Sequence, residues 1–439
     1  MPKYFWRSTD LSAHEYIPVR EAQTDTAALL ELAVSLGYHL QMCGAEIFRV
    51  EEAVNRLLVA YDTPGDVFVI PHCIIVTVCP DHGEPMTRMR RSFSRGIDID
   101  GIERYYGLAR RLCTEKPPLH EAGTMLQEIK KHRRTESLPL LYIGYFLAAG
   151  AFSVFFGGTL TDGLLAGVMG TLIGWFLRAL TGLQVNTFFK TISASFLISV
   201  ISQLLTHLTL IRYADAAAIG ALMLLVPGII FTDSMRDILY GDTLSGINKM
   251  VNVVLTAAAI LLGTGAALRV SQILWDSTSI GISLHIPYPG WVQILAAMIA
   301  CSGFCILYHI RMPGLLICMA GGGVGWGVYL CAKELGASLL IANFLAAVFI
   351  SLYAEIMARI RKYPAFSYLI IALLPLVPGA GIYYTVEYLL QRNMTDSLSQ
   401  GMETAMIAGI LAVGMLGVSS VFRMISVARQ LRSVNEKER

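Results

Sequence analysis

Charged residues are scarce in this chain: only 15% of its 439 residues are Asp, Glu, Lys or Arg, whereas 55% are hydrophobic. Soluble domains usually carry about 25% charged residues. The shortage therefore excludes water as the solvent for most of the chain and favours lipid. The charges are also unevenly placed, because 17 of the 34 Lys and Arg precede residue 137. This distribution predicts a polar N-terminal segment followed by a membrane segment.

Several other signals are missing as well. The first 25 residues lack the apolar stretch of a cleavable signal peptide, so we expect the N-terminus to stay in the cytoplasm. The run Gly321–Gly323 has neither dinucleotide-binding spacing nor a following lysine, and a net charge of +2 gives no reason to expect nucleic acid. Because the cysteines lack metal-ligand spacing, we interpret them as reduced structural thiols and expect neither a metal nor a cofactor. They are Cys43, Cys73, Cys79, Cys113, Cys301, Cys305, Cys318 and Cys331.

Ten apolar runs have about the 20 residues that a helix needs to cross a bilayer. They lie near 138–157, 160–178, 188–208, 214–231, 248–270, 290–310, 313–332, 337–358, 366–385 and 404–425. With the N-terminus inside, the cytoplasmic loops and tail hold thirteen Lys or Arg, whereas the other side holds only Arg212, Arg269, Lys333 and Arg392. Lys130, Lys131, Arg133 and Arg134 precede the first run. By the positive-inside rule, both termini are predicted to be cytoplasmic.

The membrane segment contains an internal repeat. The sequence Leu225–Gly228 (LVPG) recurs as Leu376–Gly379, five spans later. Because five is odd, equivalent helices cross in opposite directions, which predicts an inverted repeat of the kind found in transporters. The predicted fold is a membrane α-helical protein of about ten transmembrane helices in a 5+5 inverted repeat, preceded by a small cytoplasmic α/β domain. The predicted domains are residues 1–137, 138–275 and 276–439.

The predicted N-terminal domain rests on two kinds of periodicity. Helical spacing occurs at 27–42, 47–61, 102–113 and 119–131, and short β-rich runs occur at 67–70, 73–78 and 86–93. The surfaces of these elements are too charged to enter lipid.

The motifs together resemble the threonine/serine exporter family. They are Gly44–Glu51 (GAEIFRVE) followed by a strand pair around Pro71, then LVPG followed by Arg236–Asp237 and Gly241–Gly246 (GDTLSG), and finally Pro375–Tyr383. The resemblance runs from about residue 27 to 430. It implies proton-driven export of threonine and serine, or of a dicarboxylate such as succinate, in a family that also has two-component members. Asp233 is a departure, because we expect Asn there in the family.

Candidate transport residues surround the repeated motif. Proline removes a backbone donor, so Pro227–Gly228 and Pro378–Gly379 are predicted to break their spans and expose two helix N-termini that could bind a carboxylate. Structural kinks without a ligand are the alternative. Tyr383 could line the path.

Three charges, Asp233, Arg236 and Asp237, follow the first break at helical spacing, before Asp242. We expect Asp233 or Asp237 to handle the substrate ammonium or the coupling proton, and Arg236 to neutralise them. A solvated cytoplasmic loop is the alternative. Glu387 occupies the position that matches Arg236 in the second half, so these opposite charges could meet across the twofold axis of the repeat.

In the N-terminal domain the candidate residues are Gly44, Glu46, Arg49, Glu51 and His72. Glu46 and Glu51 are expected to favour the start of a helix, and Arg49 to bridge to a carboxylate or to the membrane domain. A membrane-anchored hydrolase using His72 remains an alternative of another class, but no nucleophile elbow, zinc-binding helix or phosphate loop accompanies this histidine.

The leading hypothesis is a non-enzymatic secondary transporter in the inner (plasma) membrane that exports threonine or serine. The alternative substrate is a dicarboxylate. The expected partners are the small-molecule substrate, protons and membrane lipid, and the sequence allows a homo-oligomer.

Overall fold

The computed structural model describes residues 21–79, 84–92, 96–132, 137–275, 288–361 and 363–437. Contacts divide the chain into two units: unit 1 is Met1–Gly96 with Arg104–Arg133, and unit 2 is Ile97–Glu103 with Arg134–Arg439. Some expectations fall outside the described residues, namely those on the first 20 residues, on Phe93, on Arg133 and Arg134, and on residue 276, where the second membrane half was predicted to begin.

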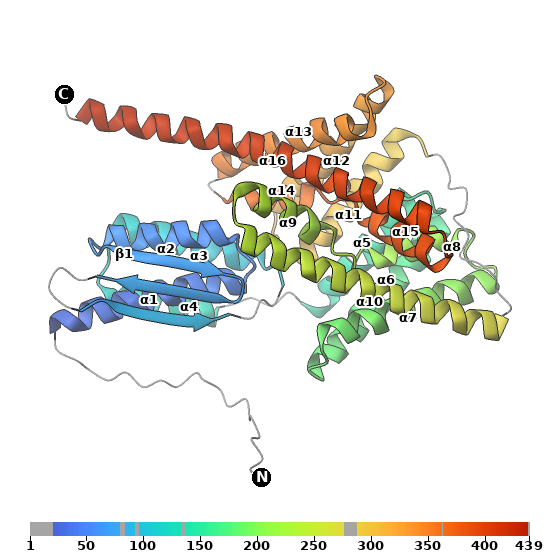
Figure 1. Cartoon of the computed structure of the whole chain (residues 1–439), viewed down its shortest axis with the longest axis horizontal. Helices are drawn as coiled ribbons and strands as arrows, with labels where there is room; N and C mark the ends of the chain where they lie inside the picture. Colours follow the sequence, from blue (N-terminus) through green and yellow to red (C-terminus); the bar gives the residue numbers. More distant parts are fainter. Residues whose placement is uncertain are drawn as a thin grey trace, which may run out of the picture. The chain divides into compact units, whose positions relative to one another are not determined.

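Unit 1 forms strands where its sequence alternates. Strands β1 (Gly65–Ile70), β2 (Cys73–Val78) and β3 (Met86–Arg91) pair antiparallel in the order β1-β2-β3 (Figure 1). In β2, Ile74, Val76 and Val78 are fully buried and alternate with partly exposed residues, as the period of two requires. The helices are α1 (Glu21–Met42), α2 (Ile47–Ala60), α3 (Ile99–Glu115) and α4 (Leu119–Lys131). The first five residues of α3, Ile99–Glu103, belong to unit 2.

Unit 2 is helical throughout its described part. Its first group is α5 (Leu138–Phe155), α6 (Leu160–Gly182), α7 (Thr187–His207), α8 (Ala214–Leu222), α9 (Gly228–Tyr240) and α10 (Thr243–Trp275). Its second group is α11 (Gly290–Leu307), α12 (Gly314–Glu334), α13 (Leu339–Arg361), α14 (Ala365–Ala372), α15 (Gly379–Leu390) and α16 (Met394–Lys437). Within the described residues, 8 helices are long and apolar enough to cross a membrane, so the chain is a multi-pass membrane protein.

The two remaining predicted spans, 214–231 and 366–385, are not single helices. Each is a pair of short helices: α8 ends at Leu222 and α9 begins at Gly228, and α14 ends at Ala372 and α15 begins at Gly379. Pro227 and Pro378 occupy the N-cap positions of α9 and α15. A proline cannot donate to the preceding turn and its ring clashes with that turn, so a helix ends before it and restarts after it.

The two groups of helices repeat each other in order and in packing. Corresponding helices start 151 to 154 residues apart, from Leu138 and Gly290 to Thr243 and Met394. Each packing pair of the first group has a counterpart in the second: α5·α6 matches α11·α12, α7·α8 matches α13·α14, α7·α10 matches α13·α16, and α9·α10 matches α15·α16. Between the groups, α5 packs on α11, α9 on α15, α9 on α16 and α10 on α15. These are the pairs that a twofold relation generates.

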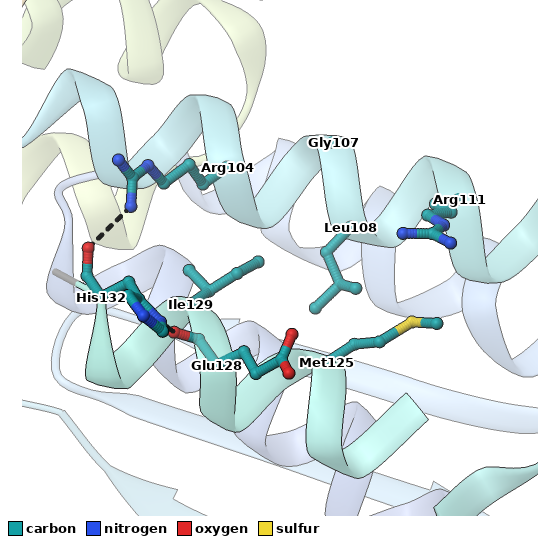
Figure 2. Close-up of a pocket in the computed structure, with 8 residues that line it drawn as sticks. All are labelled: Arg104, Gly107, Leu108, Arg111, Met125, Glu128, Ile129 and His132. Carbon is teal, nitrogen blue, oxygen red and sulfur yellow. Dashed lines mark hydrogen bonds between the residues drawn. The ribbon is translucent and has the colours of Figure 1, made fainter. Parts of the chain in front are cut away.

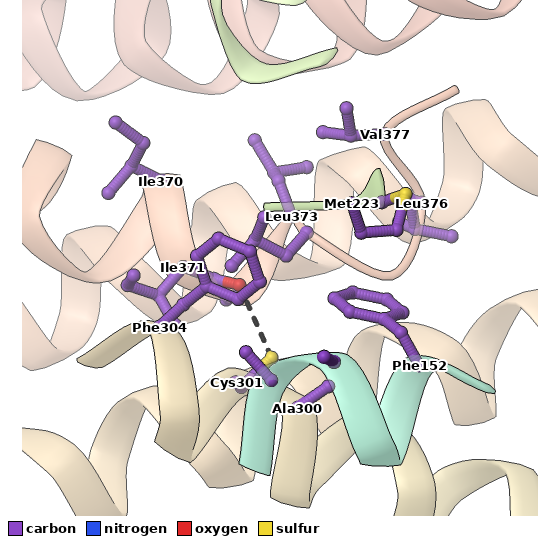
Figure 3. Packing of buried hydrophobic residues seen from close by; sticks show 14 of the residues in the cluster. Phe152, Met223, Ala300, Cys301, Phe304, Ile370, Ile371, Leu373, Leu376 and Val377 are labelled. Carbon is purple, nitrogen blue, oxygen red and sulfur yellow. Dashed lines mark hydrogen bonds between the residues drawn. The ribbon is translucent and has the colours of Figure 1, made fainter. Parts of the chain in front are cut away.

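Small residues bring the helices of unit 2 close together. A methyl group built on Gly150 of α5 would lie 2.7 Å from the carbonyl oxygen of Gly163 in α6, and one on Gly303 of α11 would lie 2.8 Å from the carbonyl oxygen of Gly144 in α5. Such contacts suit helices that associate without a hydrophobic driving force. The core continues around the second break, where Phe152, Phe304 and Ile371 pack together and the Cys301 thiol donates to the Ile371 carbonyl at 3.4 Å (Figure 3).

Candidate functional site

The two helix breaks meet. A methyl group on Gly228 would collide with the Val377 side chain and lie 3.4 Å from the Cα of Gly379. One on Gly379 would lie 2.9 Å from the Met223 side chain, on the first break. Only glycine allows this approach. The N-termini of α9 and α15, each with the partial positive charge of a helix N-terminus, therefore lie close together in unit 2.

A cluster of four charges, Asp233, Arg236, Asp237 and Lys249, lies on α9 and the start of α10. The Arg236 guanidinium is 3.5 Å from both Asp233 and Asp237, and the Lys249 ammonium is 2.7 Å from Asp237 and 4.0 Å from Asp233. Arg236 is 6% exposed and Asp237 is 7% exposed. The alternative of a solvated loop is wrong, since α9 continues to Tyr240 and buries both side chains. We call these residues the four-charge cluster.

The turn between α9 and α10 folds the chain back onto this cluster. Gly241 has φ +102°, a left-handed conformation that glycine adopts without strain. The reversal lets the Ser245 hydroxyl donate to Asp237 at 2.7 Å, and the Ser245 amide donate to Asp242 at 3.3 Å. Burial raises the pKa of Asp242. The hydrogen bond from Ser245 opposes this shift, the Asp237 carboxylate adds to it, and Lys249 opposes it.

A small cavity adjoins the four-charge cluster and both groups of helices. It is lined by Asp233 and Thr232 of α9, by Phe366 and Leu369 of α14, by Val377 of the second break and by other apolar side chains. The Arg236 guanidinium lies over the Phe366 ring, 5.4 Å from its centre. With a volume of about 10 Å³, the cavity holds at most one water in this conformation. Entry of any larger ligand therefore needs α9 and α14 to separate.

The second break carries acids and tyrosines instead. Tyr383 is 3% exposed and hydrogen-bonds Glu387, whose carboxylate also accepts from the Gln391 amide at 3.3 Å. Asp215, at the start of α8 and fully buried, interacts electrostatically with Tyr383 and with Tyr384. The expectation that Glu387 meets Arg236 stays a prediction.

The motif residues of unit 1 have structural partners. Gly44 has φ +83° in the turn between α1 and α2, and Glu46 forms an ion pair with Arg49 at 2.5 Å. The Glu51 carboxylate accepts from the Val69 amide at 2.9 Å and so ties α2 to β1. The role expected of Glu51 at the start of α2 stays a prediction. Arg49 and Glu46 also flank Tyr106, whose pKa is raised mainly by burial.

His72 lies in the turn between β1 and β2, with φ +69°, and its carbonyl accepts from the Ser92 amide at 2.9 Å. Within the described residues, no ion pair or hydrogen bond joins its side chain to a carboxylate, and no group of three or more His, Cys, Asp or Glu could hold a metal.

A surface hollow of unit 1 lies elsewhere, between α3 and α4 (Figure 2). It has a volume of about 330 Å³ and a floor of Leu108, Met125 and Ile129. Arg104 closes one end by donating to the His132 carbonyl at 2.9 Å. None of the five motif residues lines it.

Sequence reasoning missed three residues of the site. Lys249 is one of the thirteen Lys and Arg assigned to the cytoplasmic side, although Gly241 and the eight-residue spacing from Asp237 to Ser245 indicate a chain reversal that brings Lys249 close to Asp237. Asp215 lies at the edge of a predicted span, where an acid inside an apolar run is itself a signal of function. Phe366 gives no signal, since it is 130 residues from Arg236.

Comparison with known proteins adds independent information. Residues 31–271 match a family model described as "Putative threonine/serine exporter", and residues 293–421 match one described as "Threonine/Serine exporter, ThrE". The "Probable threonine/serine exporter" of Mycobacterium tuberculosis is 21% identical over 412 residues, which cover 89% of this chain and 76% of that protein. The "Threonine/serine exporter" of Corynebacterium glutamicum is 21% identical over 377 residues, covering 82% and 75%. No solved structure matches. Because the first model alone spans more than half of the sequence, the chain belongs to the threonine/serine exporter family.

Proposed function

We propose that this protein is a secondary transporter of the plasma membrane that exports threonine and serine from the cytoplasm. The family and the named relatives support the substrate. The observation that carries the proposal is the four-charge cluster beside a cavity at two meeting helix N-termini.

The charge of this cluster favours an amino acid over a dicarboxylate. Two carboxylates, Asp233 and Asp237, are balanced by Arg236 and Lys249, so the cluster is neutral. A zwitterion adds no net charge when it is buried there, and its carboxylate and ammonium can exchange partners with these groups. A dicarboxylate would bury two uncompensated negative charges, which is costly at low dielectric.

We propose an inverted repeat of ten crossings, 138–275 and 276–439, with unit 1 and both termini in the cytoplasm. The near-constant offset between corresponding helices and the matched packing pairs support this arrangement. In it, α8 with α9 and α14 with α15 each make one crossing through two half-helices, as in transporters with binding sites at the midplane. The four-charge cluster then lies toward the cytoplasm, and Asp215 and Glu387 lie toward the outside.

We also propose that protons drive export through Asp215 and Glu387. Asp233 and Asp237 are paired with the cations Arg236 and Lys249, an arrangement that suits binding of a zwitterion more than proton transfer. Glu387 is held by a tyrosine and an amide, and Asp215 lies beside two tyrosines. Protein-facing acids of this kind at membrane depth serve as proton relays.

The test is transport by the purified full chain in liposomes loaded with labelled threonine, serine or succinate, with and without an imposed proton gradient. We expect efflux of threonine and serine, faster when the outside is acidic, and little efflux of succinate. Succinate efflux without threonine efflux would replace the proposal with a dicarboxylate exporter. A proton leak with neither flux would end it.

A further inference from the structure

A short segment that includes the first residues of α3 belongs to unit 2. Residues Ile97–Glu103 belong to that unit although unit 1 precedes and follows them in sequence. The Ile99 amide donates to the Tyr308 carbonyl at 3.0 Å, in the turn between α11 and α12, and the Ile99 side chain is fully buried in the core of unit 2. We call Ile97–Glu103 together with this turn the clasp.

Ionic contacts strengthen the clasp. Arg311 of the turn is 3.0 Å from Asp100, and His309 is 4.0 Å from Asp98. His309 has φ +60°, a left-handed conformation that a non-glycine residue keeps only where its surroundings hold it. The contacts from Asp98, Ile99 and Asp100 supply such surroundings.

Glu103 is the last residue of the clasp segment and lies one helical turn after Asp100. The charged and titratable groups that act on it are Asp100 of its own helix, Arg361 at the end of α13 and Arg311, while Tyr368 of α14 feels its charge. Asp98, His309 and the Tyr308 phenol complete the ionisable groups described in the clasp. Burial and then Asp100 raise the pKa of Glu103 to about 7, and Arg361 and Arg311 only partly oppose the shift.

Because the pKa of Glu103 is raised, the effect of its protonation on the clasp can be deduced. A carboxyl group whose pKa is raised in one conformation binds its proton more tightly there than in water. Protonation therefore stabilises the closed clasp, up to the pH at which Glu103 ionises, and ionisation favours a conformation in which the carboxylate is hydrated. Glu103 reaches α14 through Tyr368, and α14 carries Phe366 and Leu369 of the cavity wall.

We propose that the clasp is a pH-controlled restraint on transport, closed when Glu103 carries a proton and released when cytoplasmic alkalinity removes it. The proposal rests on the proposed export function and on the cytoplasmic placement of this turn. Export that brings protons in would then restrain itself as the cytoplasm acidifies.

The test is threonine/threonine exchange in liposomes at equal pH on both sides, so that no gradient acts. For a group titrating near 7, the ionised fraction rises from about a tenth at about pH 6 to about nine tenths at about pH 8. We expect exchange to rise by up to about ninefold over this range in the native protein, and to stay low and pH-independent in Glu103→Gln. The matched control is Glu115→Gln, which removes an exposed carboxylate further along α3 and should keep the native profile.

A second readout does not depend on substrate. Hydrogen exchange at the Ile99 amide, normalised for its intrinsic rate, should show more protection at the lower pH in the native protein, and equal protection at both in Glu103→Gln. Absent threonine exchange with this pattern intact would refute the export function and leave the clasp standing. A native pH profile retained in Glu103→Gln, or lost instead in His309→Gln, would overturn the assignment to Glu103.

Discussion

Lys249 completes the four-charge cluster. Without it, Asp233 and Asp237 would share a single cation, Arg236, in a region where an uncompensated charge is expensive. Its ammonium reaches both carboxylates from the neighbouring helix, so it also joins α9 to α10. Lys249 therefore links two helices in addition to the binding role that we propose for the cluster.

Asp237→Asn should lower threonine export at least about tenfold. Removing one partner of a buried ion pair costs about 3–5 kcal/mol, and about 1.4 kcal/mol already corresponds to tenfold. The measurement is initial efflux from liposomes at matched protein content. Asp396→Asn, at the equivalent position of Ser245 in the second half and exposed, should be close to native. Equal losses in both variants would argue against a special role for the cluster.

Glu387→Gln should separate proton coupling from transport. The amide keeps the size and the hydrogen-bonding capacity of the side chain beside Tyr383 and Gln391 but cannot carry a proton across. We expect threonine/threonine exchange to continue while stimulation of efflux by a proton gradient disappears. A variant that still responds to the gradient like the native protein would remove Glu387 from the proton path.

At the scale of elements, the two Pro–Gly breaks determine where the half-helices begin. Each proline ends one helix, and each glycine lets the other break approach. The Ser234 hydroxyl donates to the Gly246 carbonyl, and the Ser397 hydroxyl donates to the Thr385 carbonyl, both at 2.8 Å. These bonds link the same pair of positions in both groups of helices, with donor and acceptor exchanged, so α9 is attached to α10 and α15 to α16 at matching points.

Gly228→Ala should destabilise the protein by about 1–3 kcal/mol, since an added methyl in a well-packed site forces neighbours to shift. The methyl would collide with Val377 and press on Gly379. The measurement is thermal unfolding in detergent, together with exchange activity. Gly409→Ala in α16 is the matched control, because its methyl meets no atom within 4 Å and alanine favours a helix. Equal melting temperatures for Gly228→Ala and the native protein would contradict the close approach.

Local patterns in the sequence sufficed for much of this architecture. Alternation located the strands, and the Pro–Gly pairs located both breaks. Hydropathy alone counted ten uniform spans because a run of apolar residues looks the same whether or not a proline divides it. The contacts of Arg236 with Phe366, and of Asp215 with the tyrosines of α15, bring together residues distant in sequence, which no local pattern encodes.

At the scale of the whole molecule, the proposed topology can be tested from both sides of the membrane. Leu335, 88% exposed between α12 and α13, should lie outside, and Met312, 67% exposed between α11 and α12, should lie inside. A membrane-impermeant thiol reagent should therefore label Leu335→Cys in intact cells, and Met312→Cys only in everted vesicles, each measured against the native cysteines. The opposite pattern would invert the topology, and labelling of both from one side would rule out an odd number of crossings between them.

The contact between Gly228 and Gly379 has a mechanical consequence. Because α9 and α15 touch at these two glycines, neither half-helix can tilt independently, and tilting one outward presses the other inward. In a transporter with this coupling, opening the pathway on one side of the bilayer and closing it on the other are a single movement. Such a coupling resists leakage, and a single methyl group added at the contact between the glycines would affect the pathway on both sides of the bilayer.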